Sequence, residues 1–457
     1  MGRVGLQYTV RDYNDKYFSY INGRFKVGEP WWDSGVISSQ QPLLEVALAV
    51  NRVLSKDGFL DLRVIGAVNA VFFLGSVWLA LHASRSLSIA SRAVLLGLVA
   101  LIFTDVGYVA YFNSIYSEPA SLIFFVLTLA ASLLAITSLR PSLCLLAFYS
   151  VAAALFISAR THNSTLGWLL ALWGVRLFWR WPKPSWRLGV LSAATALVAF
   201  SYWHYLATPT YIREAYLYNA VFSGILRKSP SPEEDLSALG LDRRLAILAN
   251  TNAFQPGSPI RDSEFAGAFF GSVRQSSIVR FYVTHPGRLQ RAAARQARYA
   301  FLTRPRGHGN FLKESGYPPR ARSQRFAVWS NLKARCPVNL GFLVGFFVVQ
   351  LGAGVVVQRR SASTTSRLLA ELFVILGLMA AVQYVTKFMG DGQLDTGRQL
   401  HLFNVLIDVC LIFAVLWTVN RLRDMFLAPA RGPGSRLANT WMAWTIRHVH
   451  GRRLSEP

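Results

Sequence analysis

Residues 119–139, PASLIFFVLTLAASLLAITSL, form an apolar run without a single charged side chain. The hydrocarbon core of a bilayer is about 30 Å thick, and a helix rising about 1.5 Å per residue crosses it in roughly 20 residues. The run therefore predicts a transmembrane helix, and Pro119 suits its first turn.

Eight further apolar segments lie on either side of this run. They are 64–83, 92–112, 141–159, 164–179, 187–207, 337–357, 367–388 and 400–420. Segment 164–179 is the weakest, because it is short and carries Arg176 near one end. The set predicts an all-α fold, a polytopic membrane helix bundle of about nine transmembrane helices.

The composition agrees with a membrane protein. Of the 457 residues, 53% are hydrophobic and 16% charged, whereas a soluble protein carries about 25% charged residues. The formal net charge is +25, but no RNA- or DNA-binding motif accompanies it. Basic residues also retain loops in the cytoplasm and bind anionic lipids. We therefore expect membrane lipids, and no nucleic acid, as partners.

Short basic loops predict the orientation in the membrane, since such loops stay in the cytoplasm. If successive helices cross the membrane in opposite directions, every second loop is basic, and these basic loops and the C-terminal tail fall on the same side of the membrane. The predicted parts are an extracytoplasmic segment 1–61, transmembrane helices in 62–207, an extracytoplasmic basic helical domain 208–336, transmembrane helices in 337–420 and a cytoplasmic basic tail 421–457. This describes a multi-pass protein of a bacterial inner (plasma) membrane.

Three segments outside the apolar runs need separate comment. Segment 277–302, in the long outer part, has the pattern of an amphipathic helix lying against the membrane face, and 436–450 that of an interfacial helix. Residues 1–61 are largely polar, and a polar segment of that length does not easily cross a membrane without a leading apolar helix. We expect that a first helix precedes Met1 and is lacking from the chain as given.

Two carboxylates near the outer ends of the helices are candidate catalytic groups. Asp105 is expected inside the helix over 92–112, and Glu118 follows in the loop 111–119, YFNSIYSEP, which also presents Asn113 and Tyr116. Ionisable groups at membrane depth are costly and often functional. The structural alternatives are a helix cap for Glu118 and a hydrogen-bonded core residue for Asp105.

Basic residues in two other outer segments could bind a phosphate. Arg160 and His162 lie in ARTHNS, residues 159–164, although Arg160 could simply anchor a helix end. Arg398 and His401 are three positions apart and share one face of the last helix. Asp408 lies deeper in that helix, where a carboxylate needs a partner.

The N-terminal segment contributes Asp33, within WWDSGVISSQQPLLE at 31–45, as a polar residue suited to hydroxyl-rich ligands. No nucleotide-binding signature and no His-Glu-x-x-His motif is present. The three cysteines are scattered and form neither a disulfide framework nor a metal site. No cofactor is specified, and a divalent cation is compatible with the site without being indicated by it.

These motifs, taken together, resemble the GT-C superfamily of polytopic glycosyltransferases, which includes bacterial glycan and S-layer hexose transferases. The resemblance rests on YFNSIYSEP and on LDTGRQLHLFN at 394–404. Shorter matches are NAVFSGILRKSP at 219–230, THP at 284–286, GNF at 309–311 and WSN at 329–331. In that superfamily an acidic residue typically follows the first helix, and we expect that helix and its acid to be lacking from the chain as given.

The resemblance implies inverting transfer of a hexose from a polyprenyl-phosphate donor to an extracytoplasmic glycan or another cell-envelope acceptor. A carboxylate, Glu118 or Asp105, takes the acceptor proton. Arg398, Arg160 and His401 stabilise the leaving phosphate. Two alternatives remain: a ligase or polymerase of lipid-linked oligosaccharides, and a polytopic transporter or flippase.

Overall fold

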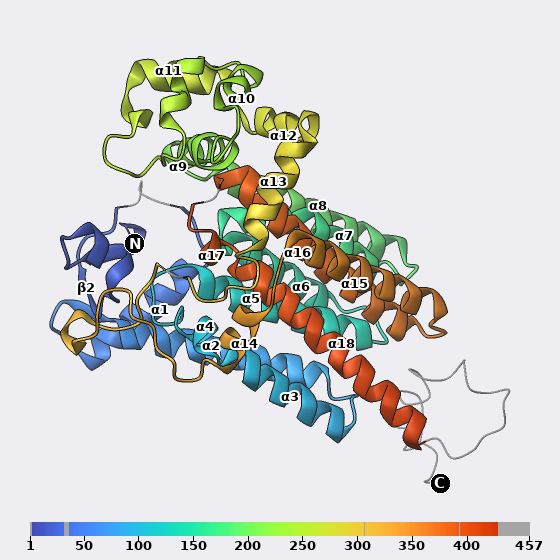
Figure 1. The fold of residues 1–457 in the computed structure, drawn as a ribbon. Helices are drawn as coiled ribbons and strands as arrows, with labels where there is room; N and C mark the ends of the chain where they lie inside the picture. The colour runs from blue at the N-terminus through green and yellow to red at the C-terminus, as the bar shows by residue number, and fades with distance from the viewer. Residues whose placement is uncertain (1, 32–35, 306, 393, 428–457) are drawn as a thin grey trace, which may run out of the picture.

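The computed structural model of the chain describes residues 2–31, 36–305, 307–392 and 394–427. A helix stands in each of the nine apolar segments, and together these helices form an elongated bundle (Figure 1). They are α2 (Leu62–Ala83), α3 (Ile89–Phe103), α5 (Glu118–Thr137), α6 (Leu143–Ala159), α7 (Gly167–Phe178), α8 (Pro184–Leu206), α15 (Leu340–Arg360), α16 (Thr364–Asp391) and α18 (His401–Leu427). The prediction of an all-α polytopic membrane protein is confirmed.

Polar residues just before these runs fix where several helices begin. The side chain of Asp61 accepts a hydrogen bond from the backbone of Arg63 at 2.8 Å, at the start of α2. Asn339 caps α15 in the same way, accepting from Phe342 at 2.9 Å. The first amides of a helix have no partner within it, so a side-chain cap satisfies them.

Fewer helices than expected have the full length of a membrane span. Among the described residues, α2, α5, α15, α16 and α18 are long and apolar enough. α8 joins them if it is counted with the segment Thr210–Ile225, from which it is bent by 79°. α3 and α6 are apolar but shorter. α7 has 12 residues, because the polar stretch Thr161–Leu166 before it forms a 3-10 turn.

The expectation that Asp105 lies inside a helix over 92–112 is wrong. α3 ends at Phe103, and Asp105 begins a separate short helix, α4 (Val106–Val109). Its carboxylate accepts from the backbone of Gly107 at 2.7 Å, which opens a new helix instead of continuing the old one. An aspartate competes for backbone amides in this way at helix starts.

The long segment after α8 is helical, as predicted, but its helices are short. They are α9 (Thr210–Tyr218), α10 (Pro232–Ala238), α11 (Ser263–Ser272), α12 (Gln275–Thr284), α13 (Pro286–Ala297) and α14 (Val328–Arg335). The single amphipathic helix expected over 277–302 is divided into α12 and α13, because Pro286 lacks an amide hydrogen and starts a new helix.

The N-terminal segment folds into a small sheet and one helix, which the sequence reading did not foresee. Strands β1 (Leu6–Tyr8), β2 (Arg24–Val27) and β3 (Phe59–Asp61) pair antiparallel in that order, and α1 (Gln40–Leu54) follows β2. Backbone bonds tie this unit to a distant loop: the Ile21 amide donates to Phe311 at 3.0 Å. One wall of the site described below is built from that junction.

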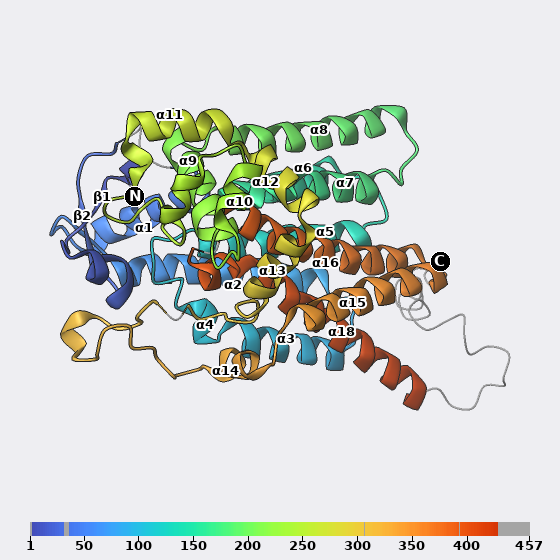
Figure 2. The same ribbon diagram turned by 45° about the horizontal axis from the view of Figure 1, so that its top comes forward.

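The two ends of the bundle differ in what they carry. One end holds the N-terminal sheet together with α9, α10 and α11, and the other holds the loop between α15 and α16 and the end of α18 (Figures 1 and 2). The predicted cytoplasmic residues Arg85 and Arg180 border one groove at the second end. Which compartment each end faces stays a prediction. The proposed interfacial helix 436–450 lies outside the described residues.

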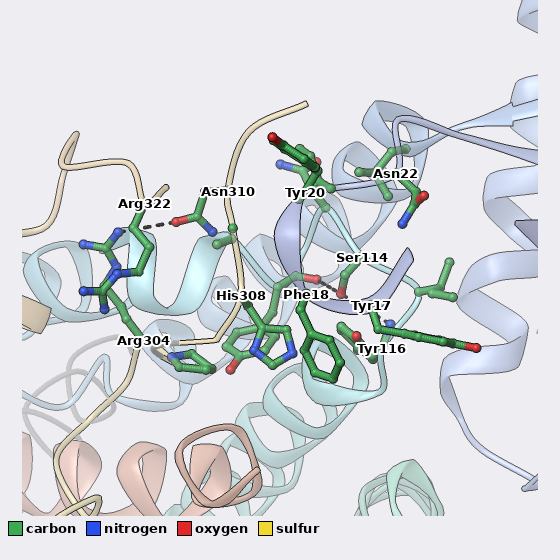
Figure 3. Close-up of a pocket in the computed structure, with 18 of the residues that line it drawn as sticks. Tyr17, Phe18, Tyr20, Asn22, Ser114, Tyr116, Arg304, His308, Asn310 and Arg322 are labelled. Atoms are coloured by element: carbon green, nitrogen blue, oxygen red, sulfur yellow. Dashed lines mark hydrogen bonds between the residues drawn. The ribbon is translucent and has the colours of Figure 1, made fainter. Parts of the chain in front are cut away.

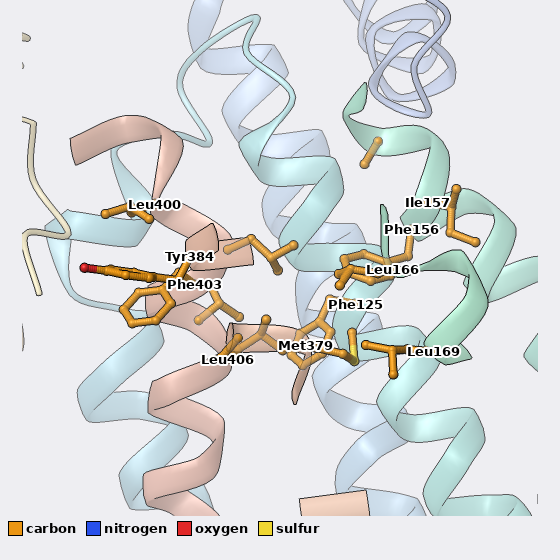
Figure 4. Packing of buried hydrophobic residues seen from close by; sticks show 14 of the residues in the cluster. Phe125, Phe156, Ile157, Leu166, Leu169, Met379, Tyr384, Leu400, Phe403 and Leu406 are labelled. Carbon is orange, nitrogen blue, oxygen red and sulfur yellow. The ribbon is translucent and has the colours of Figure 1, made fainter. Parts of the chain in front are cut away.

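The interior of the bundle is packed by side chains from α5, α6, α7, α16 and α18 (Figure 4). Phe125, Phe156 and Phe403 are at most 2% exposed. Lipid tails are as apolar as these side chains, so close packing and interhelical hydrogen bonds hold such a bundle together. One such bond runs from Trp173 Nε1 on α7 to Ser132 Oγ on α5 at 3.1 Å.

A buried ion pair joins α14 to α18 inside the bundle. Lys333 Nζ lies 2.8 Å from Asp408 Oδ1, and both side chains are at most 3% exposed. Trp329 Nε1 (2.9 Å) and the Tyr108 hydroxyl (2.5 Å) donate to the other oxygen of Asp408. The partner that this intramembrane carboxylate requires is therefore Lys333.

Candidate functional site

Glu118 is the first residue of α5 and is 1% exposed. Its position follows from the sequence Glu-Pro, because proline is favoured in the first turn and a carboxylate is stabilised at the positive end of a helix. Neither carboxylate oxygen receives a hydrogen bond from the described residues. A buried carboxylate without hydrogen bonds is unusual and calls for an explanation.

Two arginines converge on this carboxylate from different parts of the chain. Arg160, at the end of α6, brings Nη1 to 3.4 Å from Glu118 Oε1. Arg398, in α17 (Thr396–Gln399), brings Nη1 to 3.8 Å from the same oxygen. Arg160 also donates to the side chain of Gln399. Tertiary packing thus joins two predicted phosphate-binding residues and one predicted catalytic carboxylate in one cluster.

Arg398 is held on two further sides. Its Nε lies 2.5 Å from Asp395 Oδ2, and its guanidinium lies 4.5 Å from the ring centre of Tyr116. Burial alone would lower its pKa, but the carboxylates of Asp395 and Glu118 hold the pKa of Arg398 well above its ordinary value. Arg398 is therefore a permanent cation with a fixed orientation.

His401 is the first residue of α18 and is 2% exposed. The rings of Tyr108 and Tyr111 meet it edge-on, with centroid distances of 5.5 and 4.9 Å. Both of its ring nitrogens, and the Tyr111 hydroxyl, lack hydrogen-bond partners among the described residues. Together with Glu118 they form a group of buried polar atoms that have no hydrogen-bond partner among the described residues.

His162 is near this group but has a different character. Its Nε2 is buried without a partner in the described part of the chain, and its ring lies 5.4 Å from that of Tyr216. Burial, reinforced by Arg160, lowers the pKa of His162 to about 3. The imidazole is therefore neutral near pH 7, and it can donate a hydrogen bond to a phosphate but cannot offer the positive charge expected from the sequence.

An aromatic pocket of about 100 Å³ opens beside Tyr116 (Figure 3). The N-terminal segment supplies Tyr17 and Phe18, the loop before α5 supplies Tyr116, and the loop after α13 supplies His308. Burial lowers the pKa of His308 and raises that of the Tyr116 phenol, so both rings are neutral near pH 7. Because Tyr116 also carries the Arg398 guanidinium on its ring, the pocket adjoins the charged cluster.

Basic and amide groups complete the wall of the pocket. Arg304 donates to Asn310 Oδ1 at 3.3 Å, and Arg322 lies beside this pair (Figure 3). Asn113 is exposed and belongs to the same wall. The Asn113 side chain packs tightly against Gly66 of α2: a Cβ atom added to that glycine would lie 1.9 Å from Asn113 Oδ1.

The remaining predicted residues have other surroundings. Both oxygens of Asp105 are engaged, one by the amide of Gly107 and the other by the amide of Ser330 at 3.0 Å. Asp105 thus joins α4 to α14, the hydrogen-bonded role weighed as its structural alternative. Asp33 lies outside the described residues.

Further polar residues lie at this end, including a buried ion pair that the sequence analysis does not predict. Gln40 accepts from the amide of Ala120 in the first turn of α5, at 3.1 Å, and its buried Nε2 has no partner among the described residues. Lys387 and Asp391 form a buried ion pair at 3.3 Å on α16, and Asp391 also accepts from Asn219 at 2.9 Å. A lysine within the apolar run 367–388 was a signal that could have revealed this pair.

Among the described residues, no group of three or more His, Cys, Asp or Glu side chains is arranged to hold a metal ion. The groups gathered around Glu118 are the guanidinium groups of Arg160 and Arg398, the imidazole of His401 and, beside them, the aromatic pocket.

The helices and the polar cluster define a multi-pass, all-α membrane protein whose buried charges meet at one end of the bundle. Residues 1–432 match the family model described as the YfdI N-terminal transmembrane domain, and the chain belongs to that family. No curated protein and no solved structure matches the chain.

Proposed function

We propose that the protein is a membrane glycosyltransferase that moves a hexose from a polyprenyl-phosphate donor to a glycan or another acceptor of the bacterial cell envelope. The observation that carries this proposal is the buried Glu118 carboxylate, which accepts no hydrogen bond from the described residues and lies within 4 Å of both Arg160 and Arg398. Buried polar atoms are nearly always bonded in a folded protein. Their accumulation around Glu118 is best explained by a polar ligand that supplies the missing bonds.

Glu118 is suited to the role of general base. Two guanidinium groups within 4 Å favour its ionised form, which is the form that accepts a proton. As the acceptor oxygen forms its bond to the anomeric carbon, its proton passes to Glu118. The bond from that carbon to the phosphate oxygen breaks, and the phosphate keeps the electron pair. Asp105 is less suited, because both of its oxygens already accept backbone hydrogen bonds.

Arg398 and Arg160 are suited to stabilise the leaving phosphate. Each is fixed by a neighbour, Arg398 by Asp395 and Arg160 by Gln399, so little reorganisation is needed when negative charge develops. His401 has two unbonded ring nitrogens and can donate to a phosphate oxygen. Both arginines lie at the end of the bundle, where the headgroup of a lipid-linked donor would enter from the membrane.

The aromatic pocket is suited to the acceptor sugar. Tyr17, Phe18 and Tyr116 offer apolar ring faces, while Asn113 and Asn310 offer hydrogen bonds to hydroxyls. Pockets that combine aromatic walls with a few placed polar groups are typical of small-molecule sites. Tyr116 stands between this pocket and Arg398, and this neighbourhood supports the proposal that the acceptor binds in the pocket.

The test uses purified protein in lipid nanodiscs, a panel of polyprenyl-phosphate hexoses and extracted envelope glycans, with release of polyprenyl phosphate as the readout. We expect release with one donor. Glu118→Gln should reduce the rate by about 10²–10⁴-fold, the range for loss of a general base. The matched control is Glu45→Gln, the same change at an exposed position on α1.

Two outcomes would contradict the proposal. Full activity of Glu118→Gln would remove Glu118 from the mechanism. Folded protein that releases polyprenyl phosphate from no monophosphate donor would favour the alternatives, a ligase or polymerase acting on diphosphate-linked oligosaccharides or a transporter. Transfer from a diphosphate-linked donor, or movement of lipid-linked sugar between leaflets, would then distinguish those two.

A further inference from the structure

A second and larger cavity, of about 500 Å³, opens at the end of the bundle remote from Glu118. It runs between α2, α3, α5, α16 and α18, and we call it the end groove. The last turns of α5 border it, whereas Glu118 stands at the first residue of the same helix. The end groove is therefore separate from the proposed transferase site.

The depth of the end groove corresponds to one leaflet of a bilayer. Below the mouth, its lining on α5 runs from Val126 to Thr137 and its lining on α18 from Val409 to Asn420, with Arg423 about one turn further on at the mouth itself. Each stretch rises about 16 Å at roughly 1.5 Å per residue. Half of a hydrocarbon core of about 30 Å is about 15 Å, so the groove ends near the middle of the membrane.

The walls of the end groove are apolar along this depth. Leu95 and Val99 of α3, Leu133 of α5, and Ile412 and Phe413 of α18 line it. The surface matches a hydrocarbon chain, because the polar side chains among the described lining residues gather near the mouth. A lipid tail aligned with the helices fits both the chemistry and the length.

The mouth of the end groove is basic and hydroxyl-rich. Arg85, Arg180 and Arg423 border it, with no Asp or Glu among the described residues that line the cavity. Arg180 is fixed at the mouth, because it donates to the backbone carbonyl of Ser138 at 2.9 Å, just beyond the last turn of α5. Trp417 also lines the groove, and its buried Nε1 has no hydrogen-bond partner among the described residues.

We propose that the end groove binds one acyl chain of an anionic glycerophospholipid of the leaflet at this end. The phosphate sits at the mouth near Arg85, and Trp417 Nε1 donates to the ester or phosphate region. A mouth bordered by arginines, with no Asp or Glu among the described lining residues, discriminates against a zwitterionic lipid, whose ammonium group would meet like charge. This inference does not depend on the proposed transfer reaction, since it concerns the opposite end of the bundle.

The test measures lipid binding directly. The full chain in phosphatidylcholine nanodiscs receives a trace of phosphatidylglycerol with a photoreactive group on one acyl chain, and labelled peptides are identified by mass spectrometry. The same amount of photoreactive phosphatidylcholine serves as the reference lipid. We expect labelling on α3, α5 and α18 at the groove, at least five-fold higher for phosphatidylglycerol.

Two pairs of variants separate the groove from its surroundings. Val99→Trp fills the groove, whereas Leu96→Trp adds the same ring to an exposed face of α3. Arg85→Gln removes a charge at the mouth. Arg92→Gln removes a charge from an exposed residue that lies just beyond the same α2–α3 loop, and Arg92 does not line the groove. We expect Val99→Trp to abolish groove labelling and Arg85→Gln to reduce the preference for phosphatidylglycerol, with no change in either control.

Three results would overturn the inference. The first is equal labelling by the two lipids, and the second is labelling that is insensitive to Val99→Trp in a protein that remains folded. The third is complete displacement of phosphatidylglycerol by equimolar polyprenyl phosphate, which would make the groove a carrier-lipid site. None of these results bears on Glu118, so the two proposals fail separately.

Discussion

Removal of Lys333 should destabilise the protein strongly, and simultaneous neutralisation of Asp408 should reverse most of the loss. Lys333 and Asp408 are 3% and 0% exposed, and their charged atoms lie 2.8 Å apart. Lys333→Met retains most of the side-chain volume but leaves a buried carboxylate without its cation. Asp408→Asn leaves the opposite charge unpaired.

The expected magnitude follows from the contacts that remain. Breaking a buried ion pair by removing one partner costs about 3–5 kcal/mol. After Lys333→Met, Asp408 keeps the hydrogen bonds from Tyr108 and Trp329, so we expect the lower end, about 3 kcal/mol. The double variant has no unpaired charge and should lie about 1 kcal/mol below wild type, well short of the roughly 6 kcal/mol expected of independent effects.

The assay is unfolding by sodium dodecyl sulfate in mixed micelles, followed through the fluorescence of the 13 tryptophans. Lys313→Met is the matched control, because Lys313 also pairs with an aspartate, Asp15, but at an exposed position; its unfolding curve should match that of wild type. The reasoning is refuted if Lys333→Met unfolds like wild type, or if the two single losses simply add in the double variant.

Two further predictions concern the candidate site. Stability should fall as the pH drops below about 6.5, the ordinary histidine pKa, because the unfolded chain protonates His162 whereas the folded protein, in which His162 has a pKa of about 3, does not. The loss of stability at pH 5 is about 1–2 kcal/mol. His162→Gln should lack this part of the pH dependence of the unfolding curve. Gly66→Ala should lower the melting temperature, at a cost of about 1–3 kcal/mol in stability, because the added Cβ would lie 1.9 Å from Asn113 Oδ1. Adding Asn113→Ala to this variant should restore the melting temperature. A double variant as unstable as Gly66→Ala would contradict this packing.

The charged cluster shows what a linear pattern can and cannot reveal. Glu118, Arg160 and Arg398 were chosen because charges at the ends of apolar runs are costly and often functional. Their meeting at one point could not be predicted, because it depends on how α5, α6 and α17 pack. The structural role of Asp105 could not be predicted for the same reason. Its two backbone partners, Gly107 and Ser330, lie 2 and 225 positions away in the chain.

The helices themselves were largely determined by local sequence. Apolar length specifies a membrane helix because the bilayer has a fixed thickness and lipid offers the backbone no hydrogen bonds. The ends were less predictable: Asp105 interrupts one apolar segment and Pro286 another, and each does so through a local competition for backbone amides. The N-terminal sheet escaped notice because its strands are three or four residues long.

The sequence by itself determined that this is an all-α, multi-pass membrane protein, and it identified the charged residues worth following. Only the tertiary structure decided which of those charges meet, that Lys333 is the partner of Asp408, and that an aromatic pocket lies at one end and an apolar groove at the other. Hydrophobic length acts over neighbouring residues and can be read directly from the chain. Ion pairs and cavities depend on distances between helices that are far apart in the chain, as Lys333 and Asp408 are at 75 positions, and packing alone sets those distances.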